Sequence, residues 1–308
     1  MQQRKFINYI VITLKGVAMG AADVVPGVSG GTIAFISGIY EELLTSISSI
    51  NIATLKLLKS KGIKAAWEAI NGNFLIALLS GIFISIISLA KLISWLLEHK
   101  PILVWSFFFG LVLASILYVA KQITKWNIVT VILLLAGAIL AYYITTLQPL
   151  ISENSSPLFL FLAGALAICA MILPGISGAF ILVLLGAYKP VLDAVHTKNL
   201  QLLAVLAAGA IVGLLSFSKI LKWLFSHYRN FTLAILTGFI LGSLNKIWPW
   251  KKVLETKMFG DKTIVIKEVS VSPLSFDGNP QLTTALMLSI LGFAVILILE
   301  KLANSINN

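Results

Sequence analysis

The sequence predicts an all-α polytopic membrane protein that is built as an inverted-topology repeat. Three features carry this prediction: a strongly apolar composition, a series of apolar segments of membrane-spanning length, and two matched segments that are interrupted by Pro-Gly motifs. In each half of the chain we expect one re-entrant, broken-helix hairpin followed by about three transmembrane helices.

The composition favours a membrane protein over a soluble one. Of the 308 residues, 58% are hydrophobic and 11% are charged, and the mean hydropathy is +0.98. Soluble domains are typically about 45–50% apolar and about 25% charged. The net charge of +11 comes largely from lysines at the ends of apolar runs, where they meet lipid head groups. We therefore expect membrane lipids as partners and no nucleic acid.

The motifs of common enzymes and metal sites are missing from the sequence. Cys169 is the only cysteine, which excludes an internal disulfide and cysteine-based metal motifs. There is no Walker A motif, no His-Glu-x-x-His and no Ser-His-Asp order. We expect no cofactor, no metal and no enzymatic activity.

Six uninterrupted apolar segments are each about long enough to cross the ~30 Å hydrocarbon core of a bilayer. They are Phe74–Leu97, Ile102–Ala120, Ile128–Leu147, Leu202–Phe225, Phe231–Ile247 and Thr284–Leu299.

Two further apolar stretches, 6–50 and 158–195, are too long for one span and are broken in the middle. The breaks are Pro26-Gly27-Val28-Ser29-Gly30-Gly31 and Pro174-Gly175-Ile176-Ser177-Gly178. Proline and glycine free backbone groups, which are tolerated at membrane depth only where protein or a water-filled cavity satisfies them. We interpret both stretches as re-entrant hairpins. A simple kink or a small-residue packing motif is the alternative for either one.

The two halves repeat each other at fixed offsets. An offset of 148 residues pairs Pro26 with Pro174, and an offset of 128 pairs Lys91 with Lys219. The same two offsets also match Gly16, Ser29, Gly38 and Tyr40 with Gly164, Ser177, Gly186 and Tyr188, and Gly81, Trp95, His99 and Gly110 with Gly209, Trp223, His227 and Gly238.

The repeat divides the chain at about residue 150. Residues 1–150 comprise hairpin 6–50, an amphipathic basic loop 51–73 and helices within 74–147; residues 151–308 comprise hairpin 158–195, helices within 202–247, an external polar loop 248–281 and a last helix 284–299. Alternating residues in Thr263–Ser272 predict a short β-hairpin in the polar loop.

The positive-inside rule arbitrates between two topologies. Re-entrant hairpins leave three crossings in each half, which inverts the second half and puts both termini in the cytoplasm. Most basic segments are then cytoplasmic, including Lys121, Lys125 and Arg229. Fully crossing hairpins would give parallel halves and would move the lysines of 51–73 outside. The re-entrant topology fits better, although it places the five lysines of the polar loop outside.

Glycine-rich turns that open onto a helix expose several N–H groups and form a site for an anion. The expected binding residues are Pro26, Gly27, Ser29, Gly30, Gly31 and Thr32 in the first motif, Pro174, Gly175, Ser177 and Gly178 in the second, and the cations Lys91, Lys219 and Arg229. In the alternative interpretation, the serines satisfy backbone groups freed by their own prolines and the two lysines snorkel beside an aromatic belt.

Asp23 and Glu41 are the candidates for proton coupling. Asp23 lies in apolar sequence, where a carboxyl group is costly and is by default a functional candidate. The alternative is that Asp23 caps the broken helix and that Glu41 lies at the membrane interface. The repeat places Met171 opposite Asp23 and Lys189 opposite Glu41, so the two halves differ chemically.

The two motifs resemble the signature of the PopT family of undecaprenyl-phosphate translocases, formerly a domain of unknown function. The first runs from Lys15 to Thr32 as KGVAMGAADVVPGVSGGT, and the second from Leu173 to Phe180 as LPGISGAF. The family also resembles the DedA proteins in plan. The resemblance implies a flippase in the bacterial cytoplasmic membrane that returns undecaprenyl phosphate, a polyprenyl-phosphate lipid, to the inner leaflet, with a link to the proton-motive force.

Several alternatives stay open at this level. Ala179 and Phe180 replace Gly31 and Thr32 in the second motif, so both motifs or only the first bind phosphate. The competing functions are an undecaprenyl-pyrophosphate phosphatase, which the presence of only two arginines disfavours, and an ion channel or small-anion exporter. A homodimer and a monomer fit the sequence equally.

Overall fold

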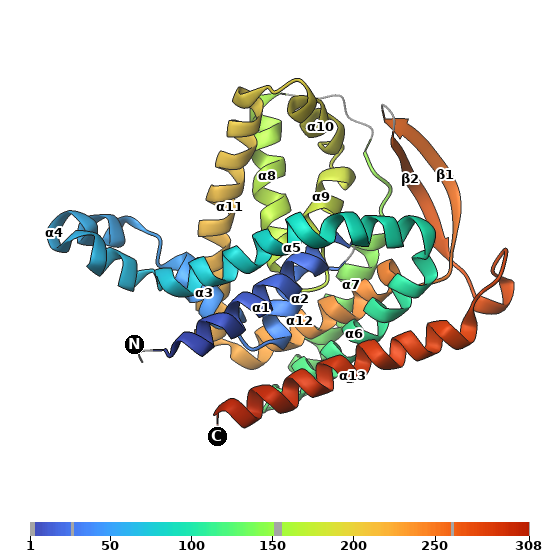
Figure 1. Cartoon of the computed structure of the whole chain (residues 1–308), viewed down its shortest axis with the longest axis horizontal. Helices are drawn as coiled ribbons and strands as arrows, with labels where there is room; N and C mark the ends of the chain where they lie inside the picture. The colour runs from blue at the N-terminus through green and yellow to red at the C-terminus, as the bar shows by residue number, and fades with distance from the viewer. Residues whose placement is uncertain (1–3, 26–27, 151–155, 260–261, 308) are drawn as a thin grey trace.

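The computed structural model describes residues 4–25, 28–150, 156–259 and 262–307. Long helices lie in side-by-side pairs, and short broken helices lie between them (Figure 1). The first half contains α1 (Phe6–Val24), α2 (Gly30–Ile36), α3 (Tyr40–Ser48), α4 (Ile52–Ala69), α5 (Gly72–His99), α6 (Pro101–Lys121) and α7 (Ile128–Thr146). The second contains α8 (Pro157–Ile172), α9 (Gly178–Leu184), α10 (Tyr188–His196), α11 (Leu200–His227), α12 (Arg229–Ser243), η1 (Leu244–Ile247), β1 (Lys251–Phe259), β2 (Lys262–Ser270), η2 (Pro273–Ser275) and α13 (Leu282–Asn307).

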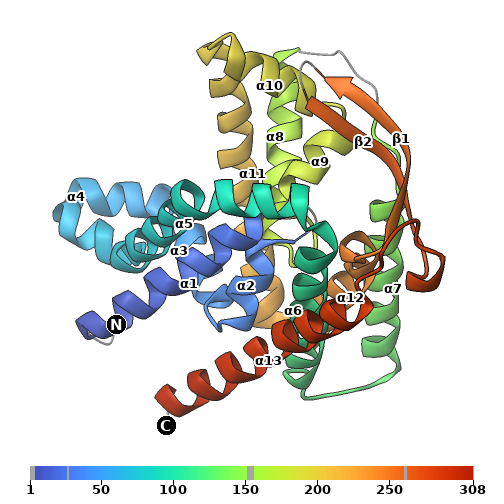
Figure 2. The same cartoon turned by 45° about the vertical axis from the view of Figure 1, so that its right-hand side comes forward.

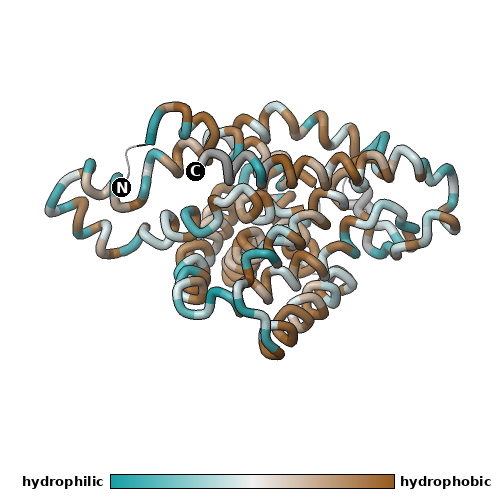
Figure 3. The backbone as a smooth tube through the Cα atoms, turned by 90° about the horizontal axis from the view of Figure 1, so that it is seen from below, coloured by the Kyte–Doolittle hydropathy of each residue, from teal (hydrophilic) through white to brown (hydrophobic). Residues whose placement is uncertain are grey.

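The chain is a multi-pass membrane protein. In the described ranges, six helical segments are long and apolar enough to cross a bilayer: α1, α5, α6, α7, α11 and α12 with η1. Their outward faces carry large apolar side chains such as Ile87, Ile132 and Ile211, all more than half exposed. Figure 3 shows hydrophobic colour along much of the helical backbone, with hydrophilic colour mainly toward the periphery. Such surfaces are stable only against lipid.

The six predicted spans are helices at nearly the bounds expected, with the last helix, α13, continuing to Asn307. Both predicted breaks are present, because α1 ends at Val24 before α2 begins, and α8 ends at Ile172 before α9 begins. In both cases the chain turns back, so that α2 packs on α1 and α9 packs on α8.

A second break in each hairpin was not predicted. Gly38 separates α2 from α3, and Gly186 separates α9 from α10, with the same φ of +73° at both glycines. This left-handed conformation is readily available only to glycine. The bend between α9 and α10 is 105°. Each hairpin therefore consists of a long helix followed by two short helices that a glycine separates.

Equivalent glycines make equivalent helix contacts in the two halves. A Cβ atom on Gly16 of α1 would lie 2.2 Å from the Leu78 carbonyl oxygen of α5, and one on Gly164 of α8 would lie 2.3 Å from the Leu206 oxygen of α11. The two glycines are related by the offset of 148 and the two carbonyls by the offset of 128. The absence of a side chain lets each pair of helices approach at backbone distance.

The remaining long helices pair across the two halves. A Cβ atom on Gly110 of α6 would lie 1.8 Å from the Ser289 oxygen of α13, and one on Gly238 of α12 would lie 2.1 Å from the Leu134 oxygen of α7. In both pairs, a helix of one half thus packs on a helix of the other half. Figures 1 and 2 both show α13 alongside α6.

Two predicted loop segments have more regular structure than expected. The segment 51–73 contains helix α4, which is interrupted at Gly62 (φ +81°) and projects from the body (Figure 2). The β-hairpin predicted within Thr263–Ser272 was wrong in extent, because β1 pairs with β2 in antiparallel register from Lys251↔Ser270 to Phe259↔Lys262. The lysines and Glu255 of β1 obscure the alternation that marks a strand.

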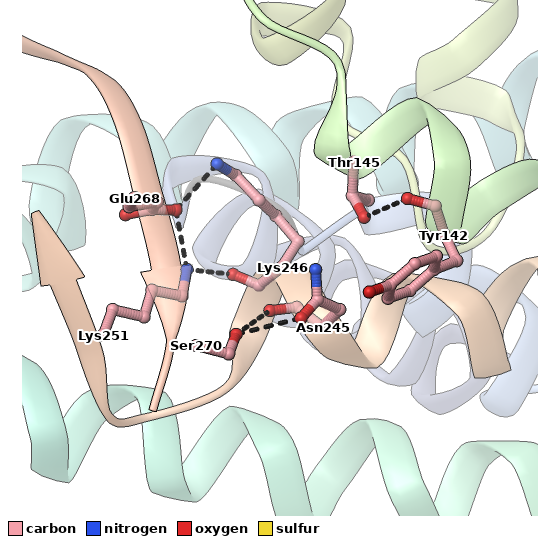
Figure 4. Close-up of polar contacts among 7 residues, drawn as sticks. All are labelled: Tyr142, Thr145, Asn245, Lys246, Lys251, Glu268 and Ser270. Carbon is pink, nitrogen blue, oxygen red and sulfur yellow. Dashed lines mark hydrogen bonds and ion pairs between the residues drawn. The ribbon is translucent and has the colours of Figure 1, made fainter. Parts of the chain in front are cut away.

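A charged cluster holds the base of this β-hairpin against η1 (Figure 4). The Glu268 carboxylate accepts hydrogen bonds from Lys246 Nζ and Lys251 Nζ, each at 2.9 Å. Lys251 Nζ also lies 5.0 Å from the centre of the Trp105 ring on α6. Burial opposes the charge of Glu268, but the two lysines outweigh burial and lower the pKa of Glu268. Burial lowers the pKa of Lys251.

We expect Gly110→Ala to destabilise the protein, because the new methyl group would meet the Ser289 oxygen of α13 and push the helices apart. Overpacking of this kind typically costs about 1–3 kcal/mol. Thermal unfolding of the purified protein in detergent should show a clear drop in melting temperature. Leu117→Ala on the same helix, whose side chain is 51% exposed, is the control and should change it little. Equal effects would contradict the close contact.

We expect Glu268→Gln to loosen the β-hairpin, seen as faster hydrogen exchange in residues 251–270. The pKa of Glu268 is lower in the folded state, so its contribution is complete above the unfolded value of about 4.3 and is lost as the pH falls through the folded value. Wild-type protein should therefore show the same loosening in that acidic range. Lys252→Gln removes the exposed Lys252–Asp277 pair and should leave exchange unchanged. Unaltered hydrogen exchange in Glu268→Gln would show that the charged cluster does not hold the β-hairpin against η1.

Candidate functional site

The two Pro-Gly turns meet inside the protein. Ser29 Oγ donates a hydrogen bond to the Met171 carbonyl oxygen at 2.9 Å, and the Gly175 amide donates to Thr32 Oγ1 at 3.0 Å. A Cβ atom on Gly31 would lie 2.5 Å from the Ile172 oxygen. The structure therefore brings together two motifs that lie more than 140 residues apart in the sequence.

The first backbone amides of α2 find hydrogen-bond acceptors within the first half. The Gly30 amide donates to Asp23 Oδ1 at 2.7 Å, and the Gly31 amide donates to Ser29 Oγ at 3.0 Å. The Thr32 amide donates to the Ser29 carbonyl oxygen at 2.9 Å. A carboxylate of the chain thus occupies the place where an external anion would bind. The predicted residues Pro26 and Gly27 lie outside the described residues.

The second motif differs from the first in its polar partners. Ser177 is buried, yet its hydroxyl makes no hydrogen bond with the described residues. The sequence repeat pairs Asp23 with Met171. The second half therefore has no carboxylate at the position from which Asp23 reaches the start of α2. Gly175 has a φ of +92°, which glycine tolerates, and Gly178 packs close to the Ala167 oxygen. Among the described residues, the polar groups at the second tip therefore have fewer hydrogen-bond partners than those at the first tip.

A charged pocket lies beside the second turn of the first hairpin. Its volume is about 340 Å³, and it lies where α3, the C-terminal end of α6 and the first residue of α12 come together. The lining residues are Phe35, Gly38, Tyr40, Glu41, Tyr118, Lys121, Gln122 and Arg229. Arg229 donates a hydrogen bond to Glu41 at 2.5 Å. Two residues that the sequence indicated for different reasons are therefore partners.

Tyr40 connects the pocket to the hairpin tips. Tyr40 is one of the lining residues, and its ring packs against Phe35 and Phe225, with ring centres 4.8 Å and 5.8 Å away. Its hydroxyl donates to the Ile172 carbonyl oxygen at 3.2 Å. One side chain therefore spans the distance between the charged pocket and the junction of the two turns.

Lys91 and Lys219 lie away from the pocket and the tips. Both are exposed, on α5 and α11, and the structure shows no hydrogen bond or ion pair of their side chains with the described residues. One turn further on, Trp95 stacks on His99 at 4.7 Å and Trp223 on His227 at 5.1 Å. This setting suits the snorkelling interpretation of the two lysines.

Of the eight lining residues, sequence reasoning predicted only Glu41 and Arg229 as site residues, and Tyr40 and Lys121 are among those that it missed. Tyr40 had a usable signal, since Gly38-x-Tyr40 recurs as Gly186-x-Tyr188. Lys121 had none, because it is one of many lysines that end an apolar segment.

Comparison with known proteins identifies the family. A family model described as undecaprenyl phosphate translocase-like matches residues 19–263. The chain is 51% identical over 304 residues to a protein of Vibrio cholerae named polyprenyl-phosphate transporter. The matched region covers 97% of this chain and 98% of that protein. It is 33% identical over 266 residues to a protein of the same name from Staphylococcus aureus, covering 81% and 88%. No solved structure gives a significant match. The resemblance carried by the two Pro-Gly motifs is thus confirmed, and the chain belongs to the undecaprenyl phosphate translocase-like family.

Proposed function

We propose that this protein is a transporter that moves undecaprenyl phosphate between the leaflets of the bacterial cytoplasmic membrane. The observation that carries the proposal is the 51% identity, over nearly the full length of both chains, to a protein named polyprenyl-phosphate transporter. Recycling of the carrier lipid is the role that follows. The multi-pass helical fold supports it, because the substrate resides in the bilayer.

We infer that residues 1–150 and 151–308 form two inverted repeats. The exchange of partners supports this inference, since α6 of the first half packs on α13, and its equivalent α12 packs on α7. A two-fold relation between the halves produces this pattern. The positive-inside rule then favours cytoplasmic termini and an external polar loop 248–281.

The meeting of the hairpins supports a gated polar path for the phosphate. A polyprenyl tail can remain in lipid, whereas a charged head group needs polar partners inside the membrane. The Pro-Gly motifs provide such partners, and the Ser177 hydroxyl makes no hydrogen bond with the residues that the structure describes. Asp23 holds the Gly30 amide at the other tip. Protonation of Asp23 would weaken this hydrogen bond and would link opening to the proton gradient.

The proposed function predicts that purified protein in liposomes accelerates leaflet exchange of undecaprenyl phosphate. Exchange is measured by the accessibility of the phosphate to an external enzyme or quencher, with and without a pH gradient. Empty liposomes provide the baseline. Asp23→Asn keeps an oxygen acceptor for Gly30 but cannot titrate, so it should abolish any response to the gradient. Exchange no faster than the baseline under every gradient would refute transport.

The equivalent serines should respond differently to replacement by alanine. Ser29→Ala removes the hydrogen bonds to Gly31 and Met171, so we expect both a lower melting temperature and slower exchange. Ser177→Ala removes a hydroxyl that has no hydrogen-bond partner in the described part of the chain. The melting temperature should then stay unchanged while exchange slows several-fold if the hydroxyl contacts the substrate. Normal exchange in Ser177→Ala would exclude that contact.

A further inference from the structure

We propose that the charged pocket beside Gly38 docks the phosphate head group on one side of the membrane, with Arg229 as its ligand and Glu41 as an internal substitute for the phosphate. This inference rests on the proposed function, and it assigns the head group a place away from the hairpin tips. When no substrate is bound, the Glu41 carboxylate neutralises Arg229. An arriving head group replaces it.

The chemistry of the pocket suits a phosphate monoester. Arg229 is one of only two arginines in the chain, and a guanidinium group binds phosphate oxygens through two parallel hydrogen bonds. Lys121 adds a second cation to the lining. The lining thus combines two basic side chains with the carboxylate of Glu41, and a phosphate monoester carries about −1.5 to −2 charges near neutral pH.

The other arginine, Arg4, forms an ion pair with Glu42 that can be compared with the Arg229–Glu41 pair. Glu42 accepts hydrogen bonds from both terminal nitrogens of Arg4, each at 2.7 Å. It accepts another from the side-chain Nδ2 of Asn71, also at 2.7 Å. That pair is less exposed, with side-chain exposures of 32% and 27%. The neighbouring residue Glu41 accepts a single hydrogen bond from Arg229.

The exposure of the Arg229–Glu41 pair makes it exchangeable. The side chains are 49% and 48% exposed, and exposed ion pairs contribute little to stability. A guanidinium group has five N–H donors, and Arg229 uses one of them on Glu41. Replacing the carboxylate by a phosphate dianion would therefore cost little and would use more of the donors.

The pocket is also connected to the proposed gate. Its wall residue Tyr40 donates a hydrogen bond to the Ile172 oxygen at the second tip, as described above. A head group that contacts Tyr40 or displaces Glu41 on α3 therefore acts on the junction of the hairpins through one side chain. Binding and opening are coupled by contact.

The sequence repeat does not duplicate the Glu41–Arg229 pair. The repeat pairs Glu41 with Lys189 and Arg229 with Pro101, so the pair has no counterpart on the other side. The topology proposed above puts this side in the cytoplasm, where Lys121, Lys125 and Arg229 gather. The asymmetry gives the two membrane faces different affinities for the head group.

The test measures binding of farnesyl phosphate, a short polyprenyl phosphate, to the full-length protein in detergent by calorimetry, with farnesol as the uncharged control. We expect Arg229→Gln to weaken binding at least tenfold and Arg229→Lys to weaken it less. Glu41→Gln should tighten binding several-fold, because the internal competitor is gone. Lys125→Gln, which removes an exposed cation outside the pocket lining, should bind like wild type. Leaflet exchange is measured for the same variants.

The direction of the Glu41→Gln effect is decisive. If the pair only joins α3 to α12, the Glu41→Gln and Arg229→Gln variants lose stability alike and neither gains affinity, which would overturn the inference. Wild-type affinity in Arg229→Gln would overturn it as well, even where wild-type protein exchanges lipid normally. Absence of both binding and exchange in wild-type protein would instead refute the proposed function, and the inference with it.

Discussion

Every backbone polar group within a bilayer needs a partner, and this constraint organises the centre of the protein. Proline and glycine interrupt a helix in each half and release amides and carbonyls where lipid cannot satisfy them. Side chains of the first hairpin satisfy backbone groups of the second: Ser29 donates a hydrogen bond to the Met171 carbonyl oxygen, and Thr32 accepts one from the Gly175 amide. The second turn therefore depends on the other half for these partners. Any movement that separates the two turns must supply new partners, from water or from a polar head group.

The long helices form a frame around this junction. Glycines such as Gly16 and Gly238 let neighbouring helices approach to backbone distance, so the contacts tolerate little sliding. Because α13 packs on α6 and α7 packs on α12, the two halves are interlocked. The short helices α2, α3, α9 and α10 are joined through glycine turns instead.

Charge is distributed unequally between the positions that the two sequence offsets pair. Asp23 caps the first tip, whereas Met171 takes the equivalent place at the second. Glu41 and Arg229 meet at one pocket, and the equivalents of both residues are chemically different. The paired positions of the two halves therefore carry different charged groups.

The sequence by itself determined the features that arise from short stretches of chain. Apolar length specified the spanning helices, and the Pro-Gly motifs specified where the helices break, because both effects act through neighbouring residues. The break at Gly38 and the full length of β1 escaped prediction, since a single glycine and a lysine-rich strand carry weak local signals.

Only the tertiary structure decided which groups become partners. Glu41 and Arg229 lie 188 residues apart, and nothing local distinguishes that pair from the neighbouring Glu42 and Arg4. Likewise, the sequence left Ser29 equally suited to substrate or to structure until packing placed the Met171 carbonyl within reach. Pairing between distant residues depends on how helices pack against each other, and that is a property of the whole chain.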